Sequence, residues 1–160
     1  MPPLLVVAIG FADYCIRWHR VHCRPMNLVR ESYTLTDEPA RFDVPSIAAL
    51  IQTTYWAAHR SVEQIVESLG HSICLALTHE GKTVGFVRAI SDRSVNSYLC
   101  DFIIAPEHRG GGLGKWMLET LLAHPDIVRT QQLLLTRDAR GFYEAYGFAE
   151  HPFVCMRRLR

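Results

Sequence analysis

Several features that would assign this chain to a specialised class are missing from its sequence. No apolar run approaches the ~20 residues of a membrane-spanning helix, so no span is predicted. Lys and Arg number 17 against 16 Asp and Glu, a formal net charge of +1, which gives no electrostatic reason to expect nucleic acid or a membrane surface as a partner. The five cysteines are odd in number and scattered, which favours reduced thiols in a cytoplasmic protein over a disulfide framework.

What remains is the composition of one ordinary globular domain, with 160 residues of which 49% are hydrophobic and 21% charged. The first 25 residues do not resemble the rest of the chain. Their apolar stretch is short and has no basic segment before it, so it makes a poor secretory signal. Cys15, His19, His22 and Cys23 match no standard zinc spacing, and we predict no metal site. Residues 1–25 are interpreted as an extension, either an upstream-start artefact or a loosely attached helix, and residues 26–160 as the domain.

The most informative stretch runs from Ser97 to His124. An apolar strand ends at Pro106, a glycine-rich turn follows, and the apolar spacing then becomes helical. The first N–H groups of a helix have no partner inside it and lie at the positive end of the helix dipole. Glycines let the backbone approach a bulky ligand, so this arrangement predicts a site for a diphosphate. The alternative is a glycine-rich connection without a ligand.

Two common phosphate-binding motifs do not fit this turn. The nucleoside triphosphate loop needs a glycine where Arg109 stands and a Ser or Thr where Trp116 stands. The dinucleotide fingerprint fails as well, since its last glycine position is occupied by Lys115 or Met117. A nucleotide-binding function is therefore the weaker interpretation.

Periodicity and turn signals predict the element order βααβββαβαβ. The predicted strands cover residues 32–36 (an edge strand), 72–78, 83–90, 97–104, 132–136 and 153–157. One helix begins near Pro45, and a second begins at Ser61, which forms a capping-box pattern with Gln64. The later helices cover residues 113–124 and 138–146.

Two motifs in this order carry a family resemblance that extends from Met26 to the C-terminus. Arg109, Gly112 and Gly114, with the preceding residues 101–108, resemble the fourth strand and coenzyme A pyrophosphate loop of the GCN5-related N-acetyltransferase (GNAT) superfamily. About thirty residues later, residues 136–148 resemble the strand and helix of that family that end in Phe-Tyr-x-x-x-Gly-Phe. Residues 55–57, 114–116 and 135–139 are similar to a generic bacterial GNAT subgroup.

The resemblance implies a mixed α/β (α+β) fold with a central twisted sheet of six to seven strands and about four flanking helices. The sheet is expected to splay between its fourth and fifth strands, with acetyl-CoA in the opening. The implied activity is direct transfer of an acetyl group to a primary amine of a small molecule or protein. The alternative is an acyl-CoA-binding regulatory module without turnover. No metal is implied, and a homodimer stays open because dimers are common in the family.

The resemblance also implies which residues hold acetyl-CoA. Strand backbone is expected to pair with the pantetheine amides as an added strand would, and loop N–H groups to hold the pyrophosphate. Gly111 departs from the family, since many members have Lys or Arg there, and Lys115 or Arg109 could compensate. The predicted cofactor-binding residues are Phe102, Ile103, Ile104, Arg109, Gly110, Gly111, Gly112, Leu113, Gly114, Lys115, Asp138 and Phe142.

Four further residues are candidates for chemistry or acceptor binding. Tyr143, at the family's tyrosine position, could give a proton to the leaving thiolate, or it could be a packing aromatic. Asp101 could be the base, acting through water, or a structural carboxylate hydrogen-bonded to nearby backbone. Tyr55 and Trp56 fall where the family builds its acceptor wall, and either stack on the substrate or belong to the core.

Overall fold

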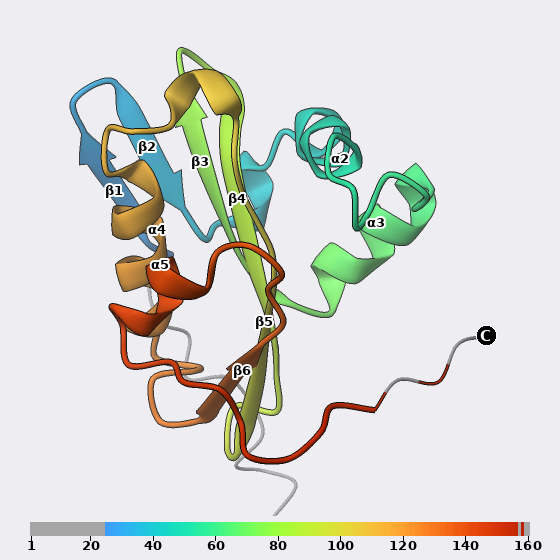
Figure 1. Ribbon diagram of the computed structural model, residues 1–160. Helices are drawn as coiled ribbons and strands as arrows, with labels where there is room; N and C mark the ends of the chain where they lie inside the picture. The colour runs from blue at the N-terminus through green and yellow to red at the C-terminus, as the bar shows by residue number, and fades with distance from the viewer. Residues whose placement is uncertain (1–24, 157, 159–160) are drawn as a thin grey trace, which may run out of the picture.

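The computed structural model describes residues 25–156 and 158, so the predicted extension, except Pro25, lies outside the described residues, as do its cysteines and histidines. A six-stranded sheet with the strands in sequence order forms the centre of the molecule (Figure 1). Each strand pairs antiparallel with the next, except that the last pair is parallel. The strands are β1 (Asn27–Arg30), β2 (Tyr33–Thr36), β3 (Ile73–His79), β4 (Lys82–Ser91), β5 (Asn96–Ile104) and β6 (Gln131–Leu134).

Helices cover both faces of the sheet, with α2 and α3 on one side and α4 and α5 on the other (Figure 1). Asp43 caps the first helix by accepting from the Ser46 N–H, and Ser61 and Gln64 form the predicted capping box. These elements confirm the mixed, two-sided fold. The helices are α2 (Val44–Gln52), α3 (Val62–Gly70), α4 (Leu113–Leu122) and α5 (Arg140–Glu144), with 3-10 turns η1 (Pro39–Arg41) and η2 (Pro106–His108).

The core lies where β3 and β4 are covered on both faces. Their burial is nearly continuous, as expected for strands between two helical layers, and the side chains of Leu75 and Phe86 are fully buried. From α4, Met117 and Leu121 are also 0% exposed, so the apolar stripe of that helix faces the sheet as predicted. Among the described residues, no helix is long and apolar enough to cross a bilayer.

The sheet opens between β5 and β6. Their parallel pairing joins Asn96–Leu99 to Gln131–Leu134 and stops there, whereas β5 continues to Ile104. Among the described residues, the second half of β5 therefore has β4 on one side and no paired strand on the other. The predicted separation falls at this place, since β5 corresponds to the fourth predicted strand.

A β-bulge interrupts the pairing of β4 and β5 next to this opening. Arg88 pairs with Cys100 and Phe86 with Ile103, so two residues of β5 lie opposite one residue of β4. Asp101 sits in the bulge with φ of +52°, a conformation that Asp tolerates better than most residues. The bulge sends the Asp101 side chain toward the α2–α3 side, where it meets Arg88, and Phe102 toward α5.

Two strand predictions were wrong. Residues 153–156 form no strand, while Arg157 is not described, so the chain after α5 does not return to the sheet over those residues. The strand predicted as an edge is internal, because β1 pairs with it from outside. β1 escaped prediction because it is four residues long, exposed throughout, and lacks an alternating pattern.

Candidate active site

The glycine-rich loop has the backbone conformation that an anion site needs. Gly110 and Gly112 adopt φ of +86° and +76°, and Gly112 is the N-cap of α4. The first bond of the helix runs from the Trp116 N–H to the Gly112 carbonyl at 3.0 Å. Within the described residues, the N–H groups of residues 110–115 donate to no protein acceptor. These donors and the helix dipole fit the pyrophosphate of coenzyme A.

Arg109 and Lys115 were expected to supply the positive charge that the family often has at the position of Gly111, but both side chains contact other groups of the protein. Arg109 donates from Nε to the Ile104 carbonyl at 2.8 Å, which ties the loop to the end of β5. That carbonyl is therefore already bonded, although Ile104 was predicted to pair with pantetheine. The ammonium of Lys115 lies 3.8 Å from the Glu119 carboxylate, one helical turn on.

A cation that sequence reasoning missed lies next to the loop instead. The guanidinium of Arg30, at the end of β1, places Nη1 and Nη2 3.7 and 3.9 Å from the position that a Cβ on Gly112 would occupy. Arg30, Tyr33, His108 and Arg109 line a hollow beside Gly111. No motif could have indicated Arg30, because only the pairing of β1 with β2 brings it to the loop.

Tyr143 stands at the opening of the sheet within an aromatic cluster. Its ring lies 6.2 Å from that of Phe102 on β5 and 5.1 Å from that of Phe142, both edge-on. Burial raises the pKa of the Tyr143 phenol to about 12, so the hydroxyl keeps its proton at neutral pH. Among the described residues no hydrogen-bond partner of this hydroxyl is found, which leaves it able to donate to a ligand. Asp138, just before α5, is exposed.

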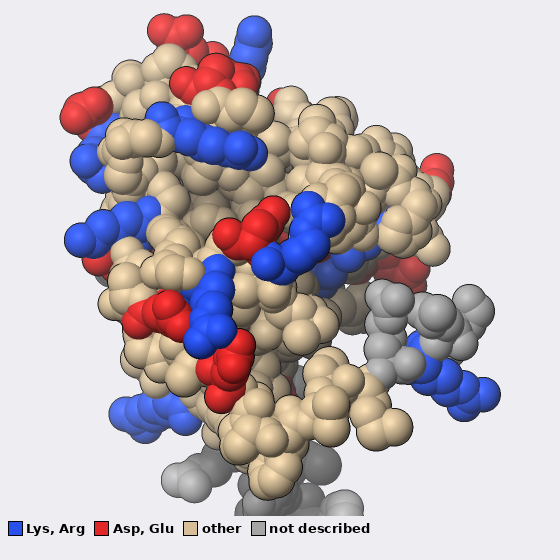
Figure 2. Space-filling model, viewed as in Figure 1, with Lys and Arg blue, Asp and Glu red and all other residues tan. Residues whose placement is uncertain are grey.

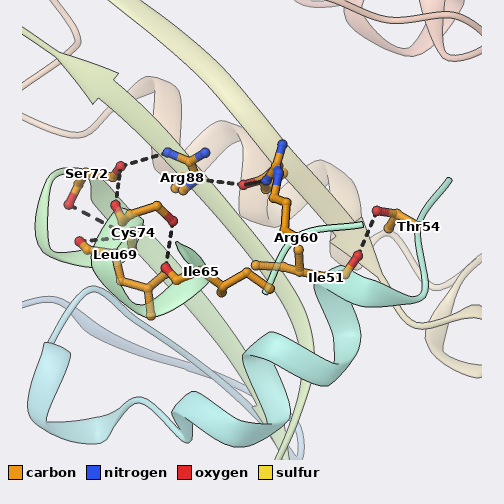
Figure 3. A network of polar contacts seen from close by, with 10 residues as sticks. Ile51, Thr54, Arg60, Ile65, Leu69, Ser72, Cys74 and Arg88 are labelled. Carbon is orange, nitrogen blue, oxygen red and sulfur yellow. Dashed lines mark hydrogen bonds and ion pairs between the residues drawn. The ribbon is translucent and has the colours of Figure 1, made fainter. Parts of the chain in front are cut away.

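Asp101 is the centre of a buried ion-pair network. Figure 3 shows its two partners, Arg60 and Arg88, with Ser72 beside Arg88. Nη1 of Arg60 lies 2.8 and 2.9 Å from its two carboxylate oxygens, and Nε of Arg88 lies 2.6 Å from Oδ2. Arg88 also donates to the Ser72 hydroxyl at 3.0 Å. Both oxygens are thus occupied, by guanidinium groups rather than by backbone. These contacts favour the structural alternative, and the role of Asp101 as a base stays a prediction.

Tyr55 and Trp56 are exposed, not core residues. Their side chains lie in the α2–α3 connection with exposed fractions of 55% and 37%, and their rings meet edge-on at 4.9 Å. The guanidinium carbon of Arg137 lies 3.7 Å from the centre of the Tyr55 ring. Both aromatic side chains are therefore open to a ligand, although contact with an acceptor stays a prediction.

The cysteines beside the network are poor nucleophiles. Burial raises the pKa of Cys74 to about 12 and that of Cys100 to about 11, and both are free thiols. Among the described residues, no group of three His, Cys, Asp or Glu side chains could hold a metal ion.

On the face of the molecule that carries α5, Lys and Arg lie beside Asp and Glu (Figure 2), as in the pairs of Arg140 with Glu144 and Glu150.

Comparison with known proteins agrees with this geometry. The sequence model described as "Acetyltransferase (GNAT) domain" matches residues 70–150. A Gibberella zeae protein named for acetyltransferase activity, FG08082, is 32% identical over 139 residues, which are 72% of this chain and 77% of that protein. The chloroplastic serotonin N-acetyltransferase 2 of Oryza sativa is 31% identical over 100 residues, which are 58% of this chain. This chain matches only 50% of the length of the rice enzyme.

Solved structures show the same architecture. A protein of Xanthomonas campestris assigned to the GNAT family aligns with a TM-score of 0.74 and 32% identity over 79% of this chain and 93% of its own. The N-acetylglutamate synthase of Neisseria gonorrhoeae, crystallised with coenzyme A and N-acetyl-glutamate, aligns with a TM-score of 0.61 over 74% of this chain and 28% of its own. At 17% identity the second likeness concerns the fold alone.

Proposed function

Because the chain belongs to the GNAT family of acetyltransferases, we propose that it transfers the acetyl group of acetyl-CoA directly to a primary amine of a small molecule or protein. The observation that carries this proposal is the position of three features along one gap in the sheet. Within the part of the chain that the structure describes, they are the free N–H groups of residues 110–115, the second half of β5 without a strand partner, and the Tyr143 phenol beside Phe102.

The residues of the gap fit acetyl-CoA. The loop amides and the Arg30 guanidinium would bind the phosphates, and the backbone of residues 102–104 would pair with the pantetheine arm, except for the Ile104 carbonyl that Arg109 occupies. Each favourable charge at a helix end contributes ~0.3–1 kcal/mol when exposed, and up to ~2 when partly buried. When bound, acetyl-CoA supplies an activated thioester.

During transfer the charge changes on three groups: the amine, the acetyl oxygen and the sulfur of the thioester. An amine with a pKa of ~10.4 must lose its proton, which costs ~4–5 kcal/mol at neutral pH. The developing oxyanion needs a hydrogen-bond donor. The amine nitrogen bonds to the acetyl carbon, the carbon–sulfur bond breaks, and the proton lost from nitrogen balances the charge on the departing sulfur.

Tyr143 is the residue proposed to assist the departing sulfur. With its pKa raised to about 12, its phenol is a weaker acid than a thiol of pKa ~8.5, so complete proton transfer to the thiolate is uphill. We therefore assign it a hydrogen bond to the sulfur as negative charge develops there. The raised pKa values of Cys74 and Cys100 argue against an acetyl-cysteine intermediate on either residue, which supports direct transfer.

The test is release of the coenzyme A thiol from acetyl-CoA in the presence of a panel of primary amines and peptides. Tyr143→Phe is expected to lower turnover at least tenfold while acetyl-CoA binding, measured by calorimetry, stays within about twofold. Tyr146→Phe is the matched control, because that tyrosine also packs on Phe142. Unchanged turnover in Tyr143→Phe would remove it from the mechanism.

Wild-type protein that binds acetyl-CoA but acetylates no amine would favour the alternative, an acyl-CoA-binding module. Binding of ATP but not of coenzyme A would overturn both proposals. A homodimer and a cytoplasmic location stay predictions, for sedimentation and for localisation of a tagged chain to test.

A further inference from the structure

One side-chain contact joins the two sides of the gap. Arg137, in the connection between β6 and α5, lies over the ring of Tyr55, in the connection between α2 and α3. Figure 1 shows the β6–α5 connection crossing in front of β5 toward the side that carries α2 and α3. Asp101 in the bulge, and Phe102, whose ring contacts that of Tyr143 from α5, lie on the strand that this connection crosses. The contact thus belongs to a connection that passes the opening beside β5, where an acceptor would approach.

The geometry of the contact leaves Arg137 able to bind an anion. A guanidinium held over an aromatic ring by a cation–π contact still presents a planar fork of N–H donors, which matches a carboxylate. The Asp138 carboxylate lies 3.6 Å from Nη2 of Arg137, too far for a hydrogen bond, and the Arg137 side chain is 67% exposed. Stacking also fixes a flexible side chain before any ligand binds, which lowers the entropy cost of binding.

The charge of the Asp101 network also favours an acceptor that carries a negative group. Among the residues that the structure describes, Asp101 is the one carboxylate paired with Arg60 and Arg88, so these three side chains carry a net charge of +1. Arg60 keeps 29% of its side chain exposed, compared with 9% for Arg88. An anionic group on the acceptor would be attracted here, and a second cationic group would be repelled.

We propose that the acceptor is a small amine that also carries a carboxylate, and that Arg137, held over the ring of Tyr55, binds this carboxylate. Arg137 is a specificity residue in this proposal and takes no part in the acetyl transfer itself. The proposal rests on the proposed function and adds the class of acceptor to it.

The experiment compares ω-amino acids from glycine to 6-aminohexanoate with the primary amide of each, so that chain length is sampled and only the carboxylate is removed. Thiol release from acetyl-CoA gives kcat and KM separately. For wild-type protein, kcat/KM is expected to be about tenfold or more higher for the best amino acid than for its amide, since a hydrogen bond to a charged group is of that order. The difference should lie in KM.

Variants of Arg137 and Tyr55 test whether this contact is the cause of the preference for the carboxylate. Arg137→Gln should abolish the preference for the carboxylate by raising KM for the amino acid, and Arg137→Lys should keep part of the preference. Tyr55→Phe is the matched control, since it retains the ring face and should retain the preference, whereas Tyr55→Leu should weaken it. Melting temperatures of all four variants check that the fold is unchanged.

Two outcomes would overturn the inference. They are an equal kcat/KM for each amino acid and its amide in the wild-type protein, and an unchanged preference for the carboxylate in Arg137→Gln. Either of them leaves the acetyltransferase proposal standing, whereas wild-type protein that neither binds acetyl-CoA nor acetylates any amine would refute that proposal instead.

Discussion

Removing the carboxylate of Asp101 should destabilise the protein more than any other single change of a charged residue described above. Its side chain is 1% exposed and holds two guanidinium groups at 2.6–2.9 Å, one of them on a side chain that is only 9% exposed. Breaking a buried ion pair costs ~3–5 kcal/mol, because the remaining charge is left without a partner. At about 2–4 °C per kcal/mol for a chain of this size, Asp101→Ala should lower Tm by roughly 6–20 °C.

The variant Asp101→Asn tests the effect of losing the negative charge on stability without the backbone strain that Ala would add. Asn tolerates positive φ about as well as Asp does, so it should lose the ion pairs without adding the strain that Ala adds at φ +52°. Arg88→Met should cost more stability than Arg60→Met, since Arg88 is the less exposed partner. The control is Arg93→Ala, which removes an ion pair with Asp126 at 2.9 Å whose partners are 66% and 35% exposed. That change should cost about 0–1 kcal/mol.

The measurements are urea denaturation and turnover on the same samples. Because Asp101 has both a structural and a catalytic interpretation, the two quantities discriminate between them. A structural carboxylate predicts a lowered midpoint in Asp101→Asn and activity lost in proportion to unfolding. A wild-type midpoint combined with a loss of kcat would refute the structural reasoning and restore Asp101 as the base.

Three further predictions concern the loop and the buried thiols. Arg30→Ala should raise KM for acetyl-CoA severalfold with little change in kcat, and Arg30→Lys should restore part of the affinity; an unchanged KM would remove Arg30 from the phosphate site. Gly112→Ala should lower the free energy of unfolding by ~1 kcal/mol, because of the φ of +76° at this position, and should weaken acetyl-CoA binding. Gly111→Ala is the control, since its Cβ would meet no atom within 4 Å, and it should have neither effect. Equal urea midpoints for the two variants would contradict this prediction. Because burial raises the pKa of Cys74 and Cys100 from 9.0 to about 12 and about 11, the folded state holds these protons more tightly, and stability should fall as pH rises from about 9 to 12. Cys100→Ala should make the fall of the urea midpoint over pH 9–11 shallower.

Local signals predicted the elements that carry strong patterns of their own. The capping box at Ser61, the turn before Lys82 and the glycine loop before α4 depend on residues close in sequence, and each lies where it was predicted. The opening beside β5 was implied by the family resemblance, and the end of the parallel pairing at Leu99 shows where it begins.

What the sequence did not show depends on contacts between distant segments. Arg30 reaches the glycine loop only because β1 pairs with β2, and the partners of Asp101 come from residues 60 and 88. An aspartate in a central strand indicated that something held it, but the pattern could not say whether that was backbone, water or guanidinium. Arg137 and Tyr55 are likewise joined only by the crossing of the β6–α5 connection.

The bulge in β5 explains how one strand serves both stability and catalysis. In a regular strand, residues 100 and 103 would point to opposite faces, but their pairing with Arg88 and Phe86, two residues apart, places them on the same face. Asp101 can then lie on the α2–α3 side between its guanidinium partners while Phe102 supports Tyr143 on the other side. The strain of a positive φ, of order 1–3 kcal/mol, is offset by the ion pairs that the bulge makes geometrically accessible. The same bulge thus positions both the ion-pair network and the ring that supports Tyr143, on opposite faces of one strand.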